Sequence, residues 1–148
     1  MSKYVYRLIG ACLAGFMATV AVPVSAADTA ALIDEAMHGA HRSDAYKARN
    51  TYRHPKETLL FFGLKPDLTV VEITPGGGWY SEILAPVLRD NGKYYAASYR
   101  ITEKSPDFFR RMDKNYRAKL ASAPQIYDKV ELVHFDAKAP VFAPDGSA

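Results

Sequence analysis

Apolar and polar positions follow two different periods along the chain, and each period predicts a different element. Three short apolar runs, rich in β-branched or aromatic residues, have the length of buried strands. Between and before them, apolar residues recur three or four positions apart, as on one face of an α-helix. The predicted strands cover 69–73, 93–98 and 130–135, and the predicted helices cover 30–38, 55–62, 79–90 and 105–121.

Proline and glycine mark where these helices begin and end. Pro55 lies in the first turn of its helix, and Gly63 ends that helix. Ser105-Pro106-Asp107 predicts an N-cap serine followed by proline at the first helical position. Pro86 lies inside its helix, which it should kink or split. The last helix has an apolar stripe of Phe109, Met112, Tyr116 and Leu120.

Strands that alternate with helices predict an α/β fold, in which right-handed crossovers build a parallel sheet with flanking helices. The expected strand order is 3-2-1, so the strand at 69–73 lies at one edge. Ligands of such sheets bind outside the carboxyl ends of the strands. In this chain Glu72, Ser98-Tyr99 and Asp136 occupy those ends.

The first strand ends on Glu72 and opens into three consecutive glycines, Gly76 to Gly78, before a helix. Glycine keeps such a turn tight and leaves backbone N–H groups free to face a bound polar group, which is typical of a nucleotide-like cofactor site. A nicotinamide site is the weaker interpretation. Ser81 stands where its third glycine is expected, and the acid precedes the glycines instead of following them by about 20 residues.

An acid followed after three residues by G-x-G resembles the first motif of the class I (Rossmann-like) S-adenosylmethionine-dependent methyltransferases. A closer resemblance is to a group of predicted exported methyltransferases of bacteria, and it covers roughly residues 42 to 142. The motifs that carry it are Arg53-His54-Pro55, Glu57-Thr58-Leu59, Phe61-Phe62-Gly63-Leu64, Glu72-Ile73, Pro75-Gly76-Gly77-Gly78-Trp79-Tyr80 and Glu82-Ile83-Leu84-Ala85-Pro86.

The resemblance implies that the cofactor is S-adenosylmethionine, bound by Glu72, Thr74, Gly76, Gly78 and Asp136. Glu72 would face the methionine end, Gly76 and Gly78 would pass beneath the adenosyl part, and Asp136 would approach the adenine amino group. Two alternatives stay open, namely Asp136 as a turn or N-cap residue and Glu72 as a solvated strand-end acid. We expect the two glycines to be required by the ligand more than by the fold.

The chain departs from the family where the second strand ends. An acid that binds both ribose hydroxyls is usual there, whereas this chain has Ser98 or Tyr99, with Glu103 as the nearest carboxylate. A single neutral hydrogen bond is weaker than a charged bidentate one, so this departure lowers the expected affinity for the cofactor. Trp79 and Tyr80 either line the adenosyl or substrate pocket or pack in the interior.

The histidines do not supply a defensible catalytic base. His54 precedes a proline and His134 lies in a predicted strand, so both are interpreted as structural. His38 and His41 are spaced as on one helix face, which suits a metal, but the simpler interpretation is a solvated helix end. The catalytic residues therefore stay unassigned, and no metal site is predicted.

The first residues predict export. Two basic residues precede an apolar run over 8–22, and small residues follow it. This pattern is typical of a secretory signal peptide, here 1–26, with cleavage after Ala26 or Ala27. A lipoprotein modified at Cys12 is the lesser alternative, because few apolar residues precede that cysteine. The expected location is periplasmic or secreted, with no stable membrane anchor after the leader is removed.

Removal of the leader changes the charge of the chain. The whole chain has 19 basic and 16 acidic residues, and the leader contains two of the basic residues and the only cysteine. The mature chain would therefore have a net charge of +1 and no thiol. Near-neutrality argues against a nucleic-acid partner, and the absence of cysteine excludes disulfides and a Cys nucleophile.

The mature chain divides into an N-terminal helical cap over 27–55, anchored by Tyr46 and Tyr52, and a partial cofactor-binding domain over 56–148. The domain is shorter than a complete methyltransferase sheet with its helices requires, and 139–148 has the composition of a turn-rich linker. The sequence therefore predicts the first half of a larger domain, whose open strand edge favours association with other chains.

The predicted function is that of an exported, S-adenosylmethionine-dependent methyltransferase-like protein, with this chain as its cofactor-binding half and inactive alone. These residues do not identify the methyl acceptor. The alternative is a non-catalytic exported binding or structural protein with a degenerate Rossmann-like domain. Export favours this alternative, because S-adenosylmethionine is made in the cytosol.

Overall fold

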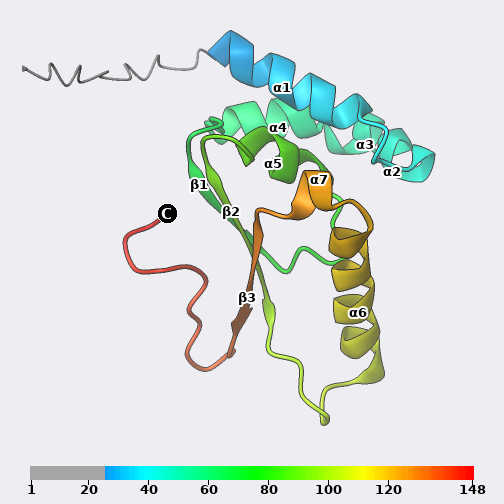
Figure 1. Ribbon diagram of the computed structural model, residues 1–148, viewed down its shortest axis with the longest axis vertical. Helices are drawn as coiled ribbons and strands as arrows, with labels where there is room; N and C mark the ends of the chain where they lie inside the picture. The colour runs from blue at the N-terminus through cyan, green and yellow to red at the C-terminus, as the bar shows by residue number, and fades with distance from the viewer. Residues whose placement is uncertain (1–25) are drawn as a thin grey trace, which may run out of the picture.

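The computed structural model describes residues 26–148, and for Ala26 it describes the backbone alone. The predicted signal peptide, apart from its last residue, and Cys12 lie outside the described residues. In Figure 1 the helices stack along one side of a small sheet, and the C-terminal segment lies on the other side.

The sheet has three parallel strands, β1 (Thr69–Ile73), β2 (Lys93–Tyr99) and β3 (Val130–Phe135), in the order β1-β2-β3. Val71 pairs with Tyr95 across β1 and β2, and Ala96 pairs with Leu132 across β2 and β3. The predicted α/β fold and the 3-2-1 order are confirmed. β1 lies at the edge of this sheet, and both crossovers run in the same direction, which places their helices on the same face.

The helices of the described residues lie close to the predicted ranges, and the cap contains two short helices between the first and the fourth. None of them is both long and apolar enough to cross a membrane. They are α1 (Ala26–His38), α2 (Asp44–Ala48), α3 (Asn50–Arg53), α4 (Pro55–Phe61), α5 (Ser81–Leu88), α6 (Asp107–Ser122) and α7 (Pro124–Tyr127).

The core lies between the sheet and the helices, with α5 at its centre. Almost every residue of α5 is buried, because α1 packs on its outer side and β2 on its inner side. Ile33 of α1, Ile83 of α5 and Ala96 of β2 are completely buried. The same face of the sheet also contributes Tyr94, which is 3 % exposed, and partly buried Leu132.

The opposite face of the sheet is covered by the C-terminal segment 140–148 and by no helix of the described residues (Figure 1). The Phe142 ring packs edge-on against Phe135, with the ring centroids 4.8 Å apart. Val71 and Ile73 line an open hollow together with this segment, and Ile73 is 51 % exposed. One face of β1 is therefore thinly covered.

Pro86 does not split α5, which is continuous from Ser81 to Leu88. Proline has no N–H, so the carbonyl of Glu82, one turn earlier, loses its helical partner. His41 Nε2 donates to that oxygen at 2.7 Å. A histidine of the cap thus replaces the hydrogen bond that the proline removes.

Two sequence predictions at the helix ends and in the cap are wrong. The N-cap of α6 is Pro106, not Ser105, and Ser105 Oγ instead accepts a hydrogen bond from Thr102 N at 2.9 Å in the preceding turn. Tyr52 does not anchor the cap, because it is 85 % exposed. Tyr46 does anchor it, since its hydroxyl donates to Gly77 O at 3.1 Å and its carbonyl accepts from Trp79 Nε1 at 2.9 Å.

Candidate functional site

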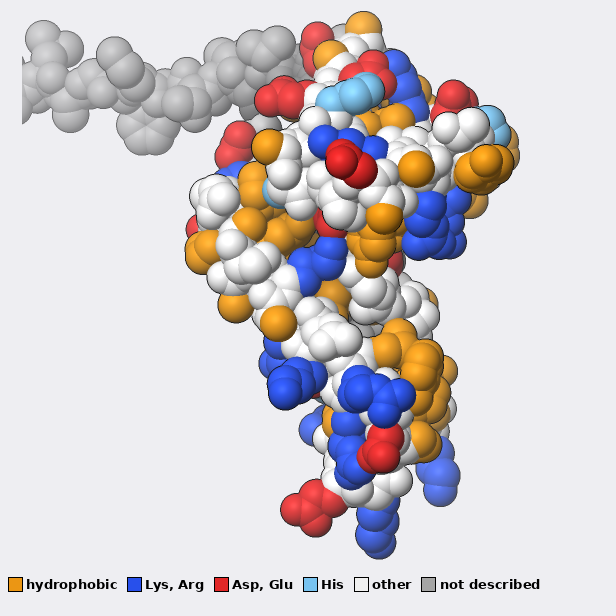
Figure 2. Space-filling view, turned by 90° about the vertical axis from the view of Figure 1, so that its right-hand side faces the viewer, with side chains coloured by type: hydrophobic (Ala, Val, Ile, Leu, Met, Phe, Trp, Pro, Cys, Tyr) orange, Lys and Arg blue, Asp and Glu red, His pale blue; other side chains and the backbone are white. Residues whose placement is uncertain are grey.

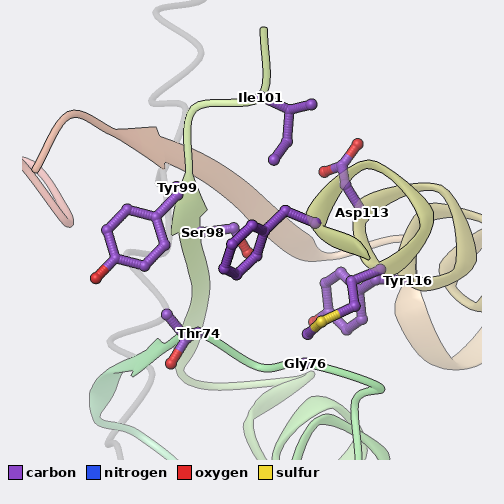
Figure 3. Close-up of a pocket in the computed structure, with 9 residues that line it drawn as sticks. Thr74, Gly76, Ser98, Tyr99, Ile101, Asp113 and Tyr116 are labelled. Atoms are coloured by element: carbon purple, nitrogen blue, oxygen red, sulfur yellow. The ribbon is translucent and has the colours of Figure 1, made fainter. Parts of the chain in front are cut away.

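A pocket lies where the carboxyl ends of β1 and β2 meet the first half of α6 (Figure 3). It is a small, open hollow, and its empty volume of ≈ 440 Å³ includes solvent at its mouth. The turn after β1, the end of β2 and one side of α6 contribute its walls. The lining residues are Thr74, Gly76, Ser98, Tyr99, Ile101, Phe109, Met112, Asp113 and Tyr116.

The turn after β1 has an unusual backbone. Thr74, Gly76 and Gly78 have φ angles of 57°, 60° and 77°, which lie in the left-handed region. For a β-branched residue this conformation costs about 1–3 kcal/mol. Thr74 N still donates to Ala97 O at 2.7 Å, so the turn begins while the chain is still bonded to β2.

The two predicted glycines have different surroundings. A Cβ at Gly76 would meet only Met112 Cε at 3.7 Å and Thr74 O at 3.9 Å, so this glycine keeps the backbone open toward the pocket. A Cβ at Gly78 would meet Tyr116 Cε2 at 2.9 Å and Lys119 Cδ at 3.0 Å. Gly78 is therefore required by the packing of α6 on the turn. The expectation that the ligand, more than the fold, requires this glycine did not include that packing.

Glu72 does not line the pocket but lies behind it in a network of hydroxyl groups. Its carboxylate accepts hydrogen bonds from Tyr94 OH and from Ser81 Oγ, the latter at 3.1 Å. Ser81 Oγ is 2.9 Å from Tyr116 OH. If each hydroxyl donates one hydrogen bond, Tyr116 donates to Ser81 and Ser81 donates to Glu72, so that every group has a partner.

Burial controls the protonation of this network. It raises the pKa of Glu72, although the hydrogen bonds from Tyr94 and Ser81 and the charge of Arg53 oppose the rise. Burial and the neighbouring Glu72 carboxylate raise the pKa of Tyr94 well above its ordinary value, and burial also raises the pKa of Tyr116. Both tyrosines therefore remain hydrogen-bond donors at neutral pH.

The helical cap is attached to α5 and α6 through a buried carboxylate. Glu82 of α5 is 2 % exposed and forms ion pairs with Arg42 at 3.1 Å and with Lys119. Lys119 belongs to α6, so a single carboxylate joins the cap, α5 and α6. The cap is therefore tied to α6, the helix that contributes one wall of the pocket.

Asp136 lies outside the pocket. It is exposed, and its Oδ1 accepts a hydrogen bond from Lys138 N at 2.9 Å in the turn after β3. Asp113 of α6 is the carboxylate that does line the pocket. It accepts from Arg117 Nε at 2.8 Å and lies 3.6 Å from His134 Nε2. Glu103, the acid expected near the ribose position, is not among the lining residues.

The structure brings together Thr74, Gly76, Ser98 and Tyr99, as expected from their places at the strand ends. It also adds residues of α6 that sequence reasoning assigned to packing or did not consider. In the sequence Phe109, Met112 and Tyr116 appear only as members of an apolar stripe, and it is the structure that leaves Phe109 43 % exposed. A stripe residue near the start of a crossover helix lies close to the carboxyl edge of the sheet.

The histidines of the described residues do not converge on one site. His38 bonds to Asp34 O, His41 to Glu82 O, and His134 Nε2 lies 2.7 Å from Arg117 Nη2. His54 adopts a φ of 43° at the start of α4. Within residues 26–148 there is no group of three His, Cys, Asp or Glu side chains placed to hold a metal ion.

Comparison of the chain with protein-family models, with curated proteins and with solved structures found no match.

Proposed function

We propose that this pocket binds the adenosyl part of S-adenosylmethionine and that the protein is an S-adenosylmethionine-dependent methyltransferase-like protein. The observation that carries the proposal is that the Phe109 ring lines the same pocket as Gly76, against which Met112 packs. An apolar slot beside an open glycine suits a flat adenine ring, since base–aromatic stacking contributes about 1–3 kcal/mol. The hydroxyl groups of Thr74 and Ser98 at the same pocket suit a ribose.

Asp113 supports the proposal by supplying a carboxylate that the second strand lacks. The family places an acid at the end of that strand, where this chain has Ser98 and Tyr99. Asp113 reaches the same pocket from α6, and Arg117 holds it in place at 2.8 Å. We assign to it the charged hydrogen bond to the ribose hydroxyls, which is stronger than a neutral one.

Methyl transfer would depend on how the site holds its two reactants, because alignment of the sulfonium with the nucleophile is chiefly a positioning effect. The described residues offer no side chain with the geometry of a general base. The catalytic residues and the methyl acceptor therefore remain unassigned in this proposal.

The proposal is tested by calorimetric titration of the protein with S-adenosylmethionine. Phe109→Ala should weaken binding at least about tenfold, because it removes the stacking surface. Phe108→Ala is the matched control, since Phe108 is its exposed neighbour and does not line the pocket. Wild-type protein that releases no heat, or equal losses in the two variants, would refute the proposal.

The second candidate is a non-catalytic exported binding or structural protein with the same fold. The observation that favours it is the pair Ser98 and Tyr99 in place of the ribose acid. The two candidates differ in their response to the cofactor. Absence of S-adenosylmethionine binding in folded wild-type protein would favour this second candidate.

We also propose that the protein is exported to the periplasm or secreted, on the evidence of the charged, apolar and small-residue segments at its start. N-terminal sequencing of protein recovered from the cell envelope should give a chain that begins near Ala27 or Asp28. Recovery of intact Met1 from the cytosol would contradict export.

A further inference from the structure

Three guanidinium groups lie on the Trp79 ring, and only one of them is paired. The Cζ atoms of Arg42, Arg49 and Arg53 lie 5.2, 5.8 and 4.7 Å from the ring centroid. Arg42 is buried and forms its ion pair with Glu82. Among the described residues, the side chains of Arg49 and Arg53 have no ion-pair or hydrogen-bond partner, and both are exposed.

Aromatic rings fix the positions of these two arginines. Arg53 also lies 5.9 Å from the centroid of Tyr80, and Arg49 lies 6.0 Å from that of Tyr46. The Trp79 ring is only 5 % exposed, and its Nε1 is bonded to the cap. Contact with a ring face orients a guanidinium group but leaves its N–H donors free for another partner.

The carboxylates around this surface are already engaged. Glu82 is shared between Arg42 and Lys119, and Glu72 accepts from Ser81 and Tyr94. Two unpaired positive charges held against one ring repel each other, and a bound anion would remove this repulsion. The surface lies beside the glycine turn, because Trp79 directly follows Gly78.

Arg53 lies close enough to the end of β1 to act on Glu72 through its charge. Glu72 is the acid that marks the strand end next to the glycine turn. The cap therefore brings a free guanidinium group from α3 to the carboxyl edge of the sheet, where a ligand is expected.

We propose that Arg49 and Arg53, on the rings of Trp79 and Tyr80, bind an anionic group, a carboxylate or a phosphate, of the ligand that meets the glycine turn. The planar fork of a guanidinium group matches both anions with paired hydrogen bonds. The anion site itself rests on the contacts above, whereas the two sources of the anion rest on the proposed function. The anion belongs either to the methionine part of the cofactor or to a separate organic acid or phosphate ester that accepts the methyl group.

Positive charge alone does not select these two arginines. Lys and Arg side chains gather over the side of the molecule that contains α6 (Figure 2). Arg111 and Lys114 of α6 are exposed, and neither has an aromatic ring close to its charge. They are therefore a matched control with the same change in net charge.

Trp79 is the only tryptophan of the chain, so its fluorescence reports directly on the proposed site. The full-length protein is titrated with inorganic phosphate and with benzoate, at an ionic strength held constant with chloride. We expect a saturable change in emission with a Kd on the order of millimolar. Arg49→Gln with Arg53→Gln should weaken this response at least about tenfold, and Arg111→Gln with Lys114→Gln should leave it unchanged.

A titration without saturation in the wild type would overturn the inference. An unchanged response in the Arg49→Gln and Arg53→Gln variant would do the same, and so would an equal loss in the control variant. Should circular dichroism show that the glutamine variant is unfolded, Arg49→Lys with Arg53→Lys replaces it. The lysines keep the positive charge but lose the planar guanidinium group, so anion binding should weaken. Unchanged anion binding in this variant would overturn the inference.

Calorimetry with S-adenosylmethionine and with 5′-methylthioadenosine, which lacks the amino-acid part, distinguishes the two sources. If the arginine variant weakens the first ligand and not the second, the anion is the carboxylate of the cofactor. If it weakens neither but abolishes the phosphate or benzoate response, the anion belongs to a separate ligand. An intact anion response without S-adenosylmethionine binding contradicts the proposed function alone, whereas the reverse contradicts this inference alone.

Discussion

Glu72 shows how a predicted site residue can act from behind a site. Its carboxylate is occupied by Tyr94 and Ser81, and Ser81 is in turn within bonding distance of Tyr116, whose ring lines the pocket. The alternative of a freely solvated acid at the strand end does not describe this arrangement. Glu72 positions the wall of the pocket through hydroxyl groups that have no other acceptor of comparable charge.

The raised pKa of Glu72 gives a pH dependence with a definite sign. The folded protein holds the proton of Glu72 more tightly than the unfolded chain does, so the stability that Glu72 contributes falls as pH rises from about 4.5 through the raised pKa. Glu72→Gln stays neutral and can still accept from Tyr94 and Ser81. Its melting temperature should therefore exceed that of the wild type at pH 7, and the difference should vanish below pH 4.5.

Thermal unfolding followed by circular dichroism at pH 7 and pH 4 measures this effect. Glu131→Gln is the control, because Glu131 is an exposed strand acid and should give the wild-type melting temperature at both pH values. A glutamine variant at position 72 that is less stable than the wild type at pH 7 would mean that the charged carboxylate stabilises the fold.

At the residue scale, the sequence identifies those site residues whose role depends on local pattern. Gly76 and Thr74 follow from the turn after an apolar strand, and the pocket contains both. Asp113 and Phe109 come from a helix whose place over the strand ends is set by tertiary packing. No spacing within α6 distinguishes a pocket residue from a packing residue, so these two could not be found in advance.

At the element scale, α5 depends on a residue outside itself. Pro86 removes a helical hydrogen bond in the middle of the most buried helix, and the imidazole of His41 supplies the replacement. A buried carbonyl left without a partner costs about 1–3 kcal/mol. This hydrogen bond therefore adds to the Arg42–Glu82 ion pair and to the packing of α1 in joining the cap to α5.

A double-mutant cycle tests this dependence. His41→Ala should lower the free energy of unfolding by about 1–3 kcal/mol, because it leaves Glu82 O without its donor. Pro86→Ala restores a backbone N–H at that position, so His41→Ala should cost less in the Pro86→Ala background. Urea denaturation of the four proteins gives the coupling energy between His41 and Pro86. A coupling energy near zero would show that His41 contributes to stability through packing and not through this hydrogen bond.

The strands were easier to predict than the ends of the helices. The run from Val130 to Phe135 is short and mostly apolar, so its composition alone marks it, and its predicted bounds are those of β3. The start of α6 depends instead on whether Ser105 bonds forward or backward along the chain. Ser105 Oγ accepts a hydrogen bond from Thr102 N in the preceding turn instead of capping α6. The sequence pattern of an N-cap does not distinguish these two uses of a serine side chain.

At the scale of the whole molecule, β1 lies at the edge of the sheet and has one well-covered face and one thinly covered face. Ile73 is at the carboxyl end of β1 on the thinly covered face and is 51 % exposed. An apolar edge strand that is not covered by a helix or loop favours pairing with another chain. We expect association to occur at this edge.

Ile73→Lys should reduce association, because a lysine on an edge strand opposes pairing between sheets. The wild type should elute earlier from size-exclusion chromatography as its concentration rises, whereas the variant should elute as a monomer throughout. Phe61→Lys is the matched control, since Phe61 is 84 % exposed but lies on α4, away from the sheet. A wild type that stays monomeric at every concentration would show that the C-terminal segment protects this edge sufficiently.

The strand order has a consequence for how the protein forms. Among the described strands, β1 and β3 each pair with β2 alone, so each strand joins the sheet next to the strand that precedes it in the chain. Within residues 26–148, no later strand is inserted between two strands already in place. The sheet can therefore be assembled in the order of synthesis, one crossover at a time, which shortens the period in which β1 and β2 are exposed without their helices.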